Sequence, residues 1–128
     1  MNQEYQPTVL DVGQCDVDHS GIAQMLMAHF HAHVDRAHNA DGAWEKIRDG
    51  NYALVLVNRI LDRNGTEGLA LIRRLQADPV TQDTPIMLVS NYADAQDAAV
   101  ALGAKRGFGK NDINAAQGYA GIAQTTGR

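Results

Sequence analysis

The feature that most constrains the fold of this chain is an apolar run at residues 52–57, Tyr-Ala-Leu-Val-Leu-Val, without a polar break. Such a run is typical of a central parallel strand, because helices cover both faces of that strand and leave neither to water. Weaker runs lie at 8–12, around Val34, at 85–89 and near Phe108. The sequence therefore predicts five short strands, the third of them deeply buried.

Amphipathic stretches separate these strands. Apolar residues recur every three or four positions, the spacing of one helix face, in the stretches 22–30, 40–47, 69–75, 95–102 and 113–120. The last stretch is expected as a helix over 111–124, although Gly118 and Gly121 each cost about 1 kcal/mol relative to alanine inside a helix. Strands that alternate with helices predict an α/β fold with one parallel sheet and helices on both faces.

Length and composition fit one globular domain. The chain has 128 residues and a mass of 13.9 kDa, with 45% hydrophobic and 20% charged residues, values that argue against disorder and against a second domain. No apolar run approaches the roughly 20 residues that cross a bilayer, and the net charge of -4 disfavours direct nucleic-acid binding. The single cysteine, Cys15, excludes an internal disulfide. We therefore expect a soluble cytoplasmic domain that contacts neither membrane nor nucleic acid.

Polar residues follow the predicted strands at their carboxyl ends, where parallel sheets bind ligands. The first strand is followed by Gly13-Gln14-Cys15-Asp16, the third ends in Asn58, the fourth in Ser90-Asn91 and the fifth in Lys110. An amide, a hydroxyl and an ammonium group on one edge suit an anion. Polar residues are also what any sheet places where its strands meet water, so the pattern locates a site without identifying its ligand.

Several segments, taken in order and at their separations, are similar to one known family. They are Val55-Leu56-Val57-Asn58, residues 65–75 with Glu67-Gly68-Leu69, residues 85–90, Ala101-Leu102-Gly103-Ala104 and Gly107-Phe108-Gly109-Lys110. Together they resemble the receiver domain of two-component response regulators, over residues 8 to about 124. The resemblance implies a flavodoxin-like (βα)5 doubly wound parallel sheet with strand order 2-1-3-4-5, in a single receiver-like domain over 1–128.

The family's chemistry depends on an aspartate at the end of the third strand, which accepts a phosphoryl group from a histidine kinase. A Ser or Thr after the fourth strand and a Lys after the fifth bind the phosphoryl oxygens, and Ser90 and Lys110 match these positions. Asn58 stands where the phosphoacceptor belongs. A carboxamide lacks the charge and nucleophilicity of a carboxylate, so Asn58 is not expected to form an acyl phosphate.

The acid pair that holds Mg²⁺ in the family is missing as well. It maps onto Gln14 and Cys15, with Asp16 as a single remaining acid, and a register shifted by one residue gives Gly13 and Gln14 instead. Because Mg²⁺ is held by carboxylates, we expect no bound Mg²⁺, no other cofactor and no enzyme activity. Phe108 lies one place later than the aromatic residue that reports phosphorylation in the family. The resemblance therefore implies a pseudo-receiver.

Two other interpretations remain open from the sequence. The loop after the third strand is about two residues longer than is usual in the family, and Asp62 in that loop, or Asp16, is a candidate substitute phosphoacceptor. Alternatively, the chain is a small flavodoxin-like ligand- or metal-binding protein. Zn²⁺ would find imidazole ligands in His29, His31 and His33, which alternate along an extended strand, whereas no Gly-rich loop offers a site for a flavin phosphate.

The leading hypothesis is a two-component signal-transduction module whose output does not depend on aspartyl phosphorylation. By resemblance, the module acts through protein contacts on the face formed by the fourth helix, fifth strand and fifth helix, at about 93–102, 105–108 and 111–124. The same face is expected to support a homodimer.

Overall fold

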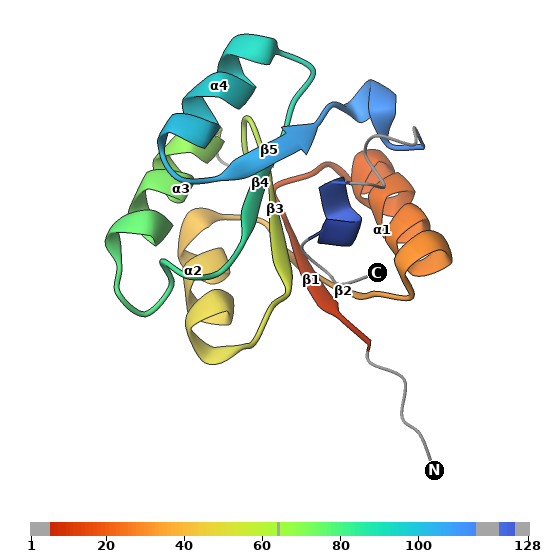
Figure 1. Cartoon of the computed structure of the whole chain (residues 1–128), viewed down its shortest axis with the longest axis horizontal. Helices are drawn as coiled ribbons and strands as arrows, with labels where there is room; N and C mark the ends of the chain where they lie inside the picture. The colour runs from red at the N-terminus through yellow and green to blue at the C-terminus, as the bar shows by residue number, and fades with distance from the viewer. Residues whose placement is uncertain (1–5, 64, 115–120, 125–128) are drawn as a thin grey trace.

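The chain folds around one parallel sheet of five strands, with helices on both faces (Figure 1). The computed structural model describes residues 6–63, 65–114 and 121–124. The strands lie in the order β2-β1-β3-β4-β5, which confirms the predicted flavodoxin-like fold. In chain order the elements are β1 (Thr8–Val12), α1 (Asp16–Phe30), β2 (His33–Ala37), α2 (Ala40–Asp49), β3 (Leu54–Asn58), α3 (Gly68–Ala77), β4 (Ile86–Val89), α4 (Ala93–Ala101), β5 (Lys105–Phe108) and the 3₁₀ helix η1 (Lys110–Asp112).

The apolar run forms the central strand β3, in which every residue of Leu54–Asn58 is buried. β1 and β4 pair with this strand on its two sides. Side chains alternate between the two faces along a strand, so Val55 and Val57 pack into the core on one face of the sheet, and Leu54 and Leu56 into the core on the other. Burial on both faces explains why the run has no polar break.

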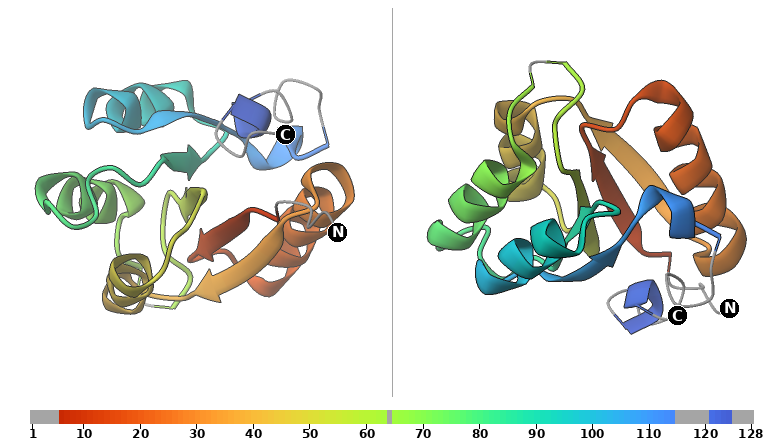
Figure 2. Two further views of the ribbon diagram at one scale, coloured as in Figure 1. Left: turned by 60° about the horizontal axis from the view of Figure 1, so that its bottom comes forward. Right: turned by 90° about the horizontal axis from the view of Figure 1, so that it is seen from above.

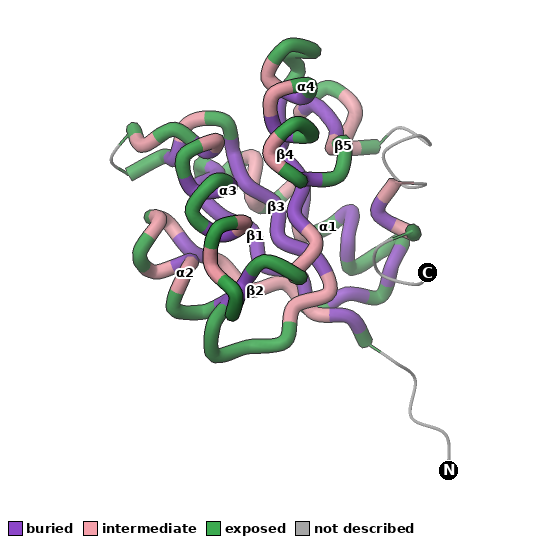
Figure 3. Tube along the Cα trace, turned by 60° about the vertical axis from the view of Figure 1, so that its left-hand side comes forward, coloured by how far each residue is buried: buried purple, intermediate pink, exposed green. Residues whose placement is uncertain are grey.

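Two layers of helices cover the sheet (Figure 2). α2, α3 and α4 lie on one face, where Leu71 and Ala99 belong to the core. α1 lies on the other face together with residues 121–124, and Leu26 and Ile122 are fully buried there. Buried positions concentrate on the strands and on the inner sides of the helices, whereas exposed positions concentrate on the loops and outer helix sides (Figure 3).

α1 is the longest described helix, with 15 residues. It begins at Asp16 and ends at Phe30, where His31 adopts a left-handed backbone with φ of 53°. A membrane-spanning helix needs about 20 predominantly apolar residues. No helix within the described ranges meets the length and hydropathy of a membrane span.

The end of the chain differs from the helix expected over 111–124. After β5 the chain forms the short 3₁₀ helix η1, and it is helical again at 121–124. Residues 115–120 of the expected helix lie outside the described residues. At η1 the Asn111 N–H donates a hydrogen bond to Asn91 Oδ1 (3.2 Å), which lies after the neighbouring strand β4, so a contact distant in sequence holds this turn.

Candidate functional site

The carboxyl edge of the sheet brings three of the predicted site residues to one small pocket. The pocket has a volume of about 190 Å³ and is lined by Asn58, Ser90 and Lys110 from the ends of β3, β4 and β5. Arg59 and Tyr92 lie on its outer wall, with the Arg59 guanidinium carbon 5.0 Å from the centre of the Tyr92 ring. Parallel strands place their carboxyl ends at the same edge, which explains this convergence of residues distant in sequence.

The side-chain amide of Asn58 is hydrogen-bonded to the main chain around it. Its side-chain nitrogen Nδ2 donates to the carbonyl oxygens of Gly13 (3.0 Å) and Ile60 (2.7 Å), and the residue is 9% exposed. A carboxylate has no hydrogen to donate, so an aspartate in this conformation would face two carbonyl oxygens. The local backbone therefore suits a carboxamide at residue 58 better than a carboxylate.

The residues after β1 do not lie together around the pocket. Gly13 has a φ of 77°, and a Cβ atom at this position would lie only 2.9 Å from Leu61 Cα. Gln14 is 1% exposed, whereas Cys15 and Asp16 are exposed on the outer side of the turn. The predicted acid-pair positions are thus divided between the interior and the surface.

Two carboxylates at the start of α1, close to this edge, have cationic partners from the chain itself. Lys110 Nζ lies 2.7 Å from Asp18 Oδ2, and this contact holds the pKa of the Asp18 carboxyl below its usual value. Asp16 Oδ1 accepts a hydrogen bond from Arg36 (2.8 Å), which likewise lowers the pKa of Asp16. The sequence had singled out Lys110 without its partner Asp18. Their pairing depends on the start of α1 lying beside the end of β5, which spacing does not reveal.

Asp62, the candidate substitute phosphoacceptor, lies in the loop between β3 and α3. Its carboxylate oxygens are 3.6 Å from His38 Nδ1 and 3.8 Å from Arg63 Nε. The Asp62 N–H donates to the Gly13 carbonyl oxygen (3.0 Å), which fixes this part of the loop over the end of β1.

The residues at the end of β1 do not fit the Mg²⁺ site that the fold family implies. Mg²⁺ requires oxygen ligands, usually including one or two carboxylates, and Gly13, Gln14 and Cys15 supply no carboxylate. The loop residue Leu61, which is 1% exposed, also packs directly over Gly13.

The structure also tests the alternative of a zinc site built from three histidines. In the described parts of the chain, no group of three or more His, Cys, Asp or Glu side chains is arranged to bind a metal ion. His29, His31 and His33 fall on the end of α1, on the residue after it and on β2, rather than along one strand. The strand geometry that motivated the zinc interpretation was therefore wrong.

A close contact between a buried aspartate and a histidine of α1 was not anticipated from the sequence. Asp11 Oδ2 lies 2.7 Å from His19 Nδ1, and the Asp11 side chain is 0% exposed. Burial raises the pKa of Asp11 to about 6, against the opposing effect of His19. The available signal was an aspartate within the first apolar run, followed eight residues later by a histidine at the start of the helix that covers it.

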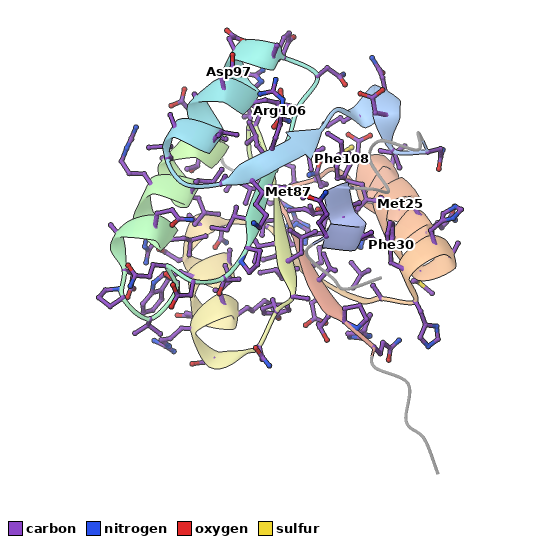
Figure 4. The ribbon with its side chains drawn as sticks, viewed as in Figure 1. Met25, Phe30, Met87, Asp97, Arg106 and Phe108 are labelled. Atoms are coloured by element: carbon purple, nitrogen blue, oxygen red, sulfur yellow. The ribbon has the colours of Figure 1, made fainter. Side chains whose placement is uncertain are left out.

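Phe108, the predicted switch-region aromatic, lies in the core between the sheet and α1. It is 6% exposed and belongs to the same cluster as Met25 and Met87 (Figure 4). Its position at the end of β5 places it next to the pocket in sequence, two residues before Lys110.

Solved structures with the same fold are response-regulator receiver domains. The signal receiver domain of a DNA-binding response regulator (merR) from Colwellia psychrerythraea is 21% identical with a TM-score of 0.79, covering 96% of this chain and 100% of that chain. A two-component response regulator from Clostridium difficile is 21% identical with a TM-score of 0.77, covering 96% and 98% of the two chains. A CheY-like receiver domain protein from Methanospirillum hungatei is 16% identical with a TM-score of 0.72, covering 94% and 97%. No protein-family model and no curated protein matches the sequence.

The sheet order and these likenesses together define the fold. The sheet order places the chain among doubly wound, flavodoxin-like α/β proteins. Within that class, the likeness over nearly the full length of all three chains gives it the CheY-like receiver fold. At identities of 16–21% the likeness concerns the fold, and function has to be argued from the site.

Proposed function

We propose that this chain is a receiver-like module of two-component signalling that acts through protein contacts, without accepting a phosphoryl group and without Mg²⁺. The observation that carries the proposal is the environment of Asn58. Both hydrogen bonds of its amide nitrogen go to main-chain carbonyl oxygens, at 3.0 and 2.7 Å. The residue at the phosphoacceptor position is therefore unreactive by its chemistry and is also integrated into the backbone that surrounds it.

Ser90 and Lys110 support this proposal because each already makes a polar contact within the chain. Ser90 Oγ accepts a hydrogen bond from the Tyr92 N–H (3.1 Å), and Lys110 pairs with Asp18. In a phosphorylated site, a hydroxyl and an ammonium at these positions would neutralise phosphoryl oxygens. Here the Asp18 carboxylate takes the place of a phosphoryl group beside Lys110, and the Tyr92 N–H binds Ser90 Oγ. These contacts favour a single arrangement of the loops.

The surface proposed for partner binding is formed by α4 and β5, together with the segment that follows β5. On α4 the side chain of Val100 is 43% exposed, and Asp97 pairs with Arg106 of β5 on the same surface (Figure 4). An exposed apolar residue beside charged groups suits a protein interface better than it suits a small-molecule site. A homodimer through this face is part of the same proposal.

Incubation with acetyl phosphate and Mg²⁺, followed by intact-mass measurement, tests the proposal directly. We expect no phosphoryl adduct on the wild-type chain, because neither the nucleophile nor the metal ligands are present. The same result is expected for Asn58→Asp, since Gly13, Gln14 and Cys15 still supply no carboxylate and Asp16 is paired with Arg36. A stoichiometric adduct on the wild type that is lost in hydroxylamine would overturn the proposal. If the adduct still forms on Asp62→Asn, or on Asp16→Asn, the substituted residue is excluded as the acceptor.

A further inference from the structure

A single buried side chain of α4 is bonded to two neighbouring strands. Gln96 is 5% exposed, and its amide makes three hydrogen bonds with main-chain groups. Its Nε2 donates to the carbonyl oxygens of Leu88 (2.9 Å) and Ser90 (3.1 Å) at β4, and its Oε1 accepts from the Gly107 N–H (2.9 Å) of β5. One helix residue is thus attached to both strands at once.

These bonds form where the pairing of β4 with β5 is interrupted. Met87 pairs with Lys105 but Val89 pairs with Phe108, so two steps along β4 correspond to three along β5. An extra residue of this kind leaves main-chain groups without partners in the ladder. Unpaired polar groups are costly when they are buried, and the Gln96 amide supplies a donor and an acceptor at that point.

Two further contacts hold β5 in place, one against β4 and one against α4. A Cβ atom on Gly107 would collide with the Leu88 carbonyl oxygen, so the strands approach this closely only because residue 107 is glycine. At the surface, Arg106 Nη1 donates to Asp97 Oδ1 at 2.7 Å (Figure 4). Exposed ion pairs contribute little to stability, so the buried amide of Gln96 is the stronger of these two polar connections between α4 and β5.

We propose that Gln96 is a conformational latch that joins α4 and β5 into one rigid unit and ties that unit to the pocket residue Ser90. The inference rests on the proposed function, since the α4–β5 face is the surface offered there to a partner. Ser90 is itself fixed, because its N–H donates to the Phe108 carbonyl oxygen (3.0 Å). A partner that binds this face meets a preformed surface and loses little conformational entropy in ordering it.

Hydrogen exchange on the full chain tests the latch without a partner. In the wild type, we expect the Gly107 amide to exchange as slowly as the amides inside β4, although a side chain accepts its hydrogen bond. In Gln96→Leu, which removes all three bonds from a similar volume, we expect the amides of Gly107 and of residues 93–101 to exchange about tenfold faster or more. The exchange rates of amides in β1 and β3 should rise only as much as the loss of global stability requires.

Thr81→Val, in the connection between α3 and β4, provides a matched control. Thr81 is 0% exposed and its Oγ1 donates to the Leu75 carbonyl oxygen (2.8 Å), so the variant also removes a buried hydrogen bond but leaves α4 untouched. It should lower global stability without selective exchange in α4. Should Gln96→Leu fail to fold, Gln96→Glu keeps the acceptor for Gly107 and loses both donors, and the amides of residues 93–101 should still exchange selectively faster.

Two results would overturn the latch. In the first, the Gln96 variants lose protection from exchange in α4 only in proportion to their loss of global stability, as Thr81→Val does. The other is a wild-type Gly107 amide that exchanges at the rate of an exposed amide. Neither measurement involves phosphorylation or docking, so a failure of the latch is distinguishable from a failure of the proposed function.

Discussion

Gly68→Ala is expected to lower the free energy of unfolding by about 3 kcal/mol, although alanine is ordinarily the better helix residue. α3 begins at Gly68 directly beside the end of β3. A Cβ atom there would collide with the Asn58 carbonyl oxygen and would lie 3.0 Å from Val57 Cγ1. The obstacle is the backbone of the central strand, which cannot move aside as the end of a flexible side chain can.

Urea unfolding followed by the fluorescence of the single tryptophan, Trp44, measures this change. Gly21→Ala is the matched control, because Gly21 lies inside α1 and an added Cβ has no atom within 4 Å. We expect this control to raise the unfolding free energy by about 1 kcal/mol. Similar effects of the two substitutions would contradict a rigid close approach of α3 to the carbonyl of residue 58.

Asp11→Asn should remove an unusual pH dependence of stability. Burial raises the pKa of Asp11 to about 6 from the model-compound value of 3.8, so the folded chain binds this proton more tightly than the unfolded chain does. Between about pH 4 and 6 the folded state therefore holds more protons, and this group makes stability fall as the pH rises. At neutral pH the ionised Asp11 costs about 3 kcal/mol by this linkage.

Denaturant unfolding of the wild type and of Asp11→Asn, repeated from pH 4 to pH 7, isolates the effect. The stability of Asp11→Asn relative to the wild type should rise by about 3 kcal/mol across this range. Asp49→Asn is a nearly flat control, because the hydrogen bond from Arg48 lowers the pKa of Asp49 below its usual value, and the contribution of this carboxyl therefore changes mainly below pH 4. A constant difference between wild type and Asp11→Asn would show that the folded and unfolded chains bind the Asp11 proton equally.

The fold could be predicted because each strand has a local signature. The run at 52–57 indicated a strand covered on both faces, and β3 is completely buried. The end of the chain was harder, because whether residues after β5 continue as a helix depends on contacts such as the one between Asn91 and Asn111, which come from different strand ends. Residue spacing along one segment carries no information about such contacts.

In the site, too, the features that depend on one segment could be predicted, and the contacts between distant segments could not. The positions of Asn58, Ser90 and Lys110 at one edge follow from strand order and strand length, and the structure brings them to one pocket. Their partners do not follow from the sequence. The pairing of Lys110 with Asp18 depends on how α1 is rotated, and the pairing of Asp11 with His19 depends on which face of β1 the helix covers.

Leu61 packed over Gly13 bears on any attempt to engineer phosphotransfer into this scaffold. An acidic side chain cannot be introduced at position 13 on the present backbone, because its Cβ would come within 2.9 Å of Leu61 Cα. Asn58→Asp alone would give a carboxylate with no room beside it for a second acid from position 13. An acid at position 13 would therefore require Leu61 to move away from the end of β1 before any phosphotransfer chemistry could be tested there.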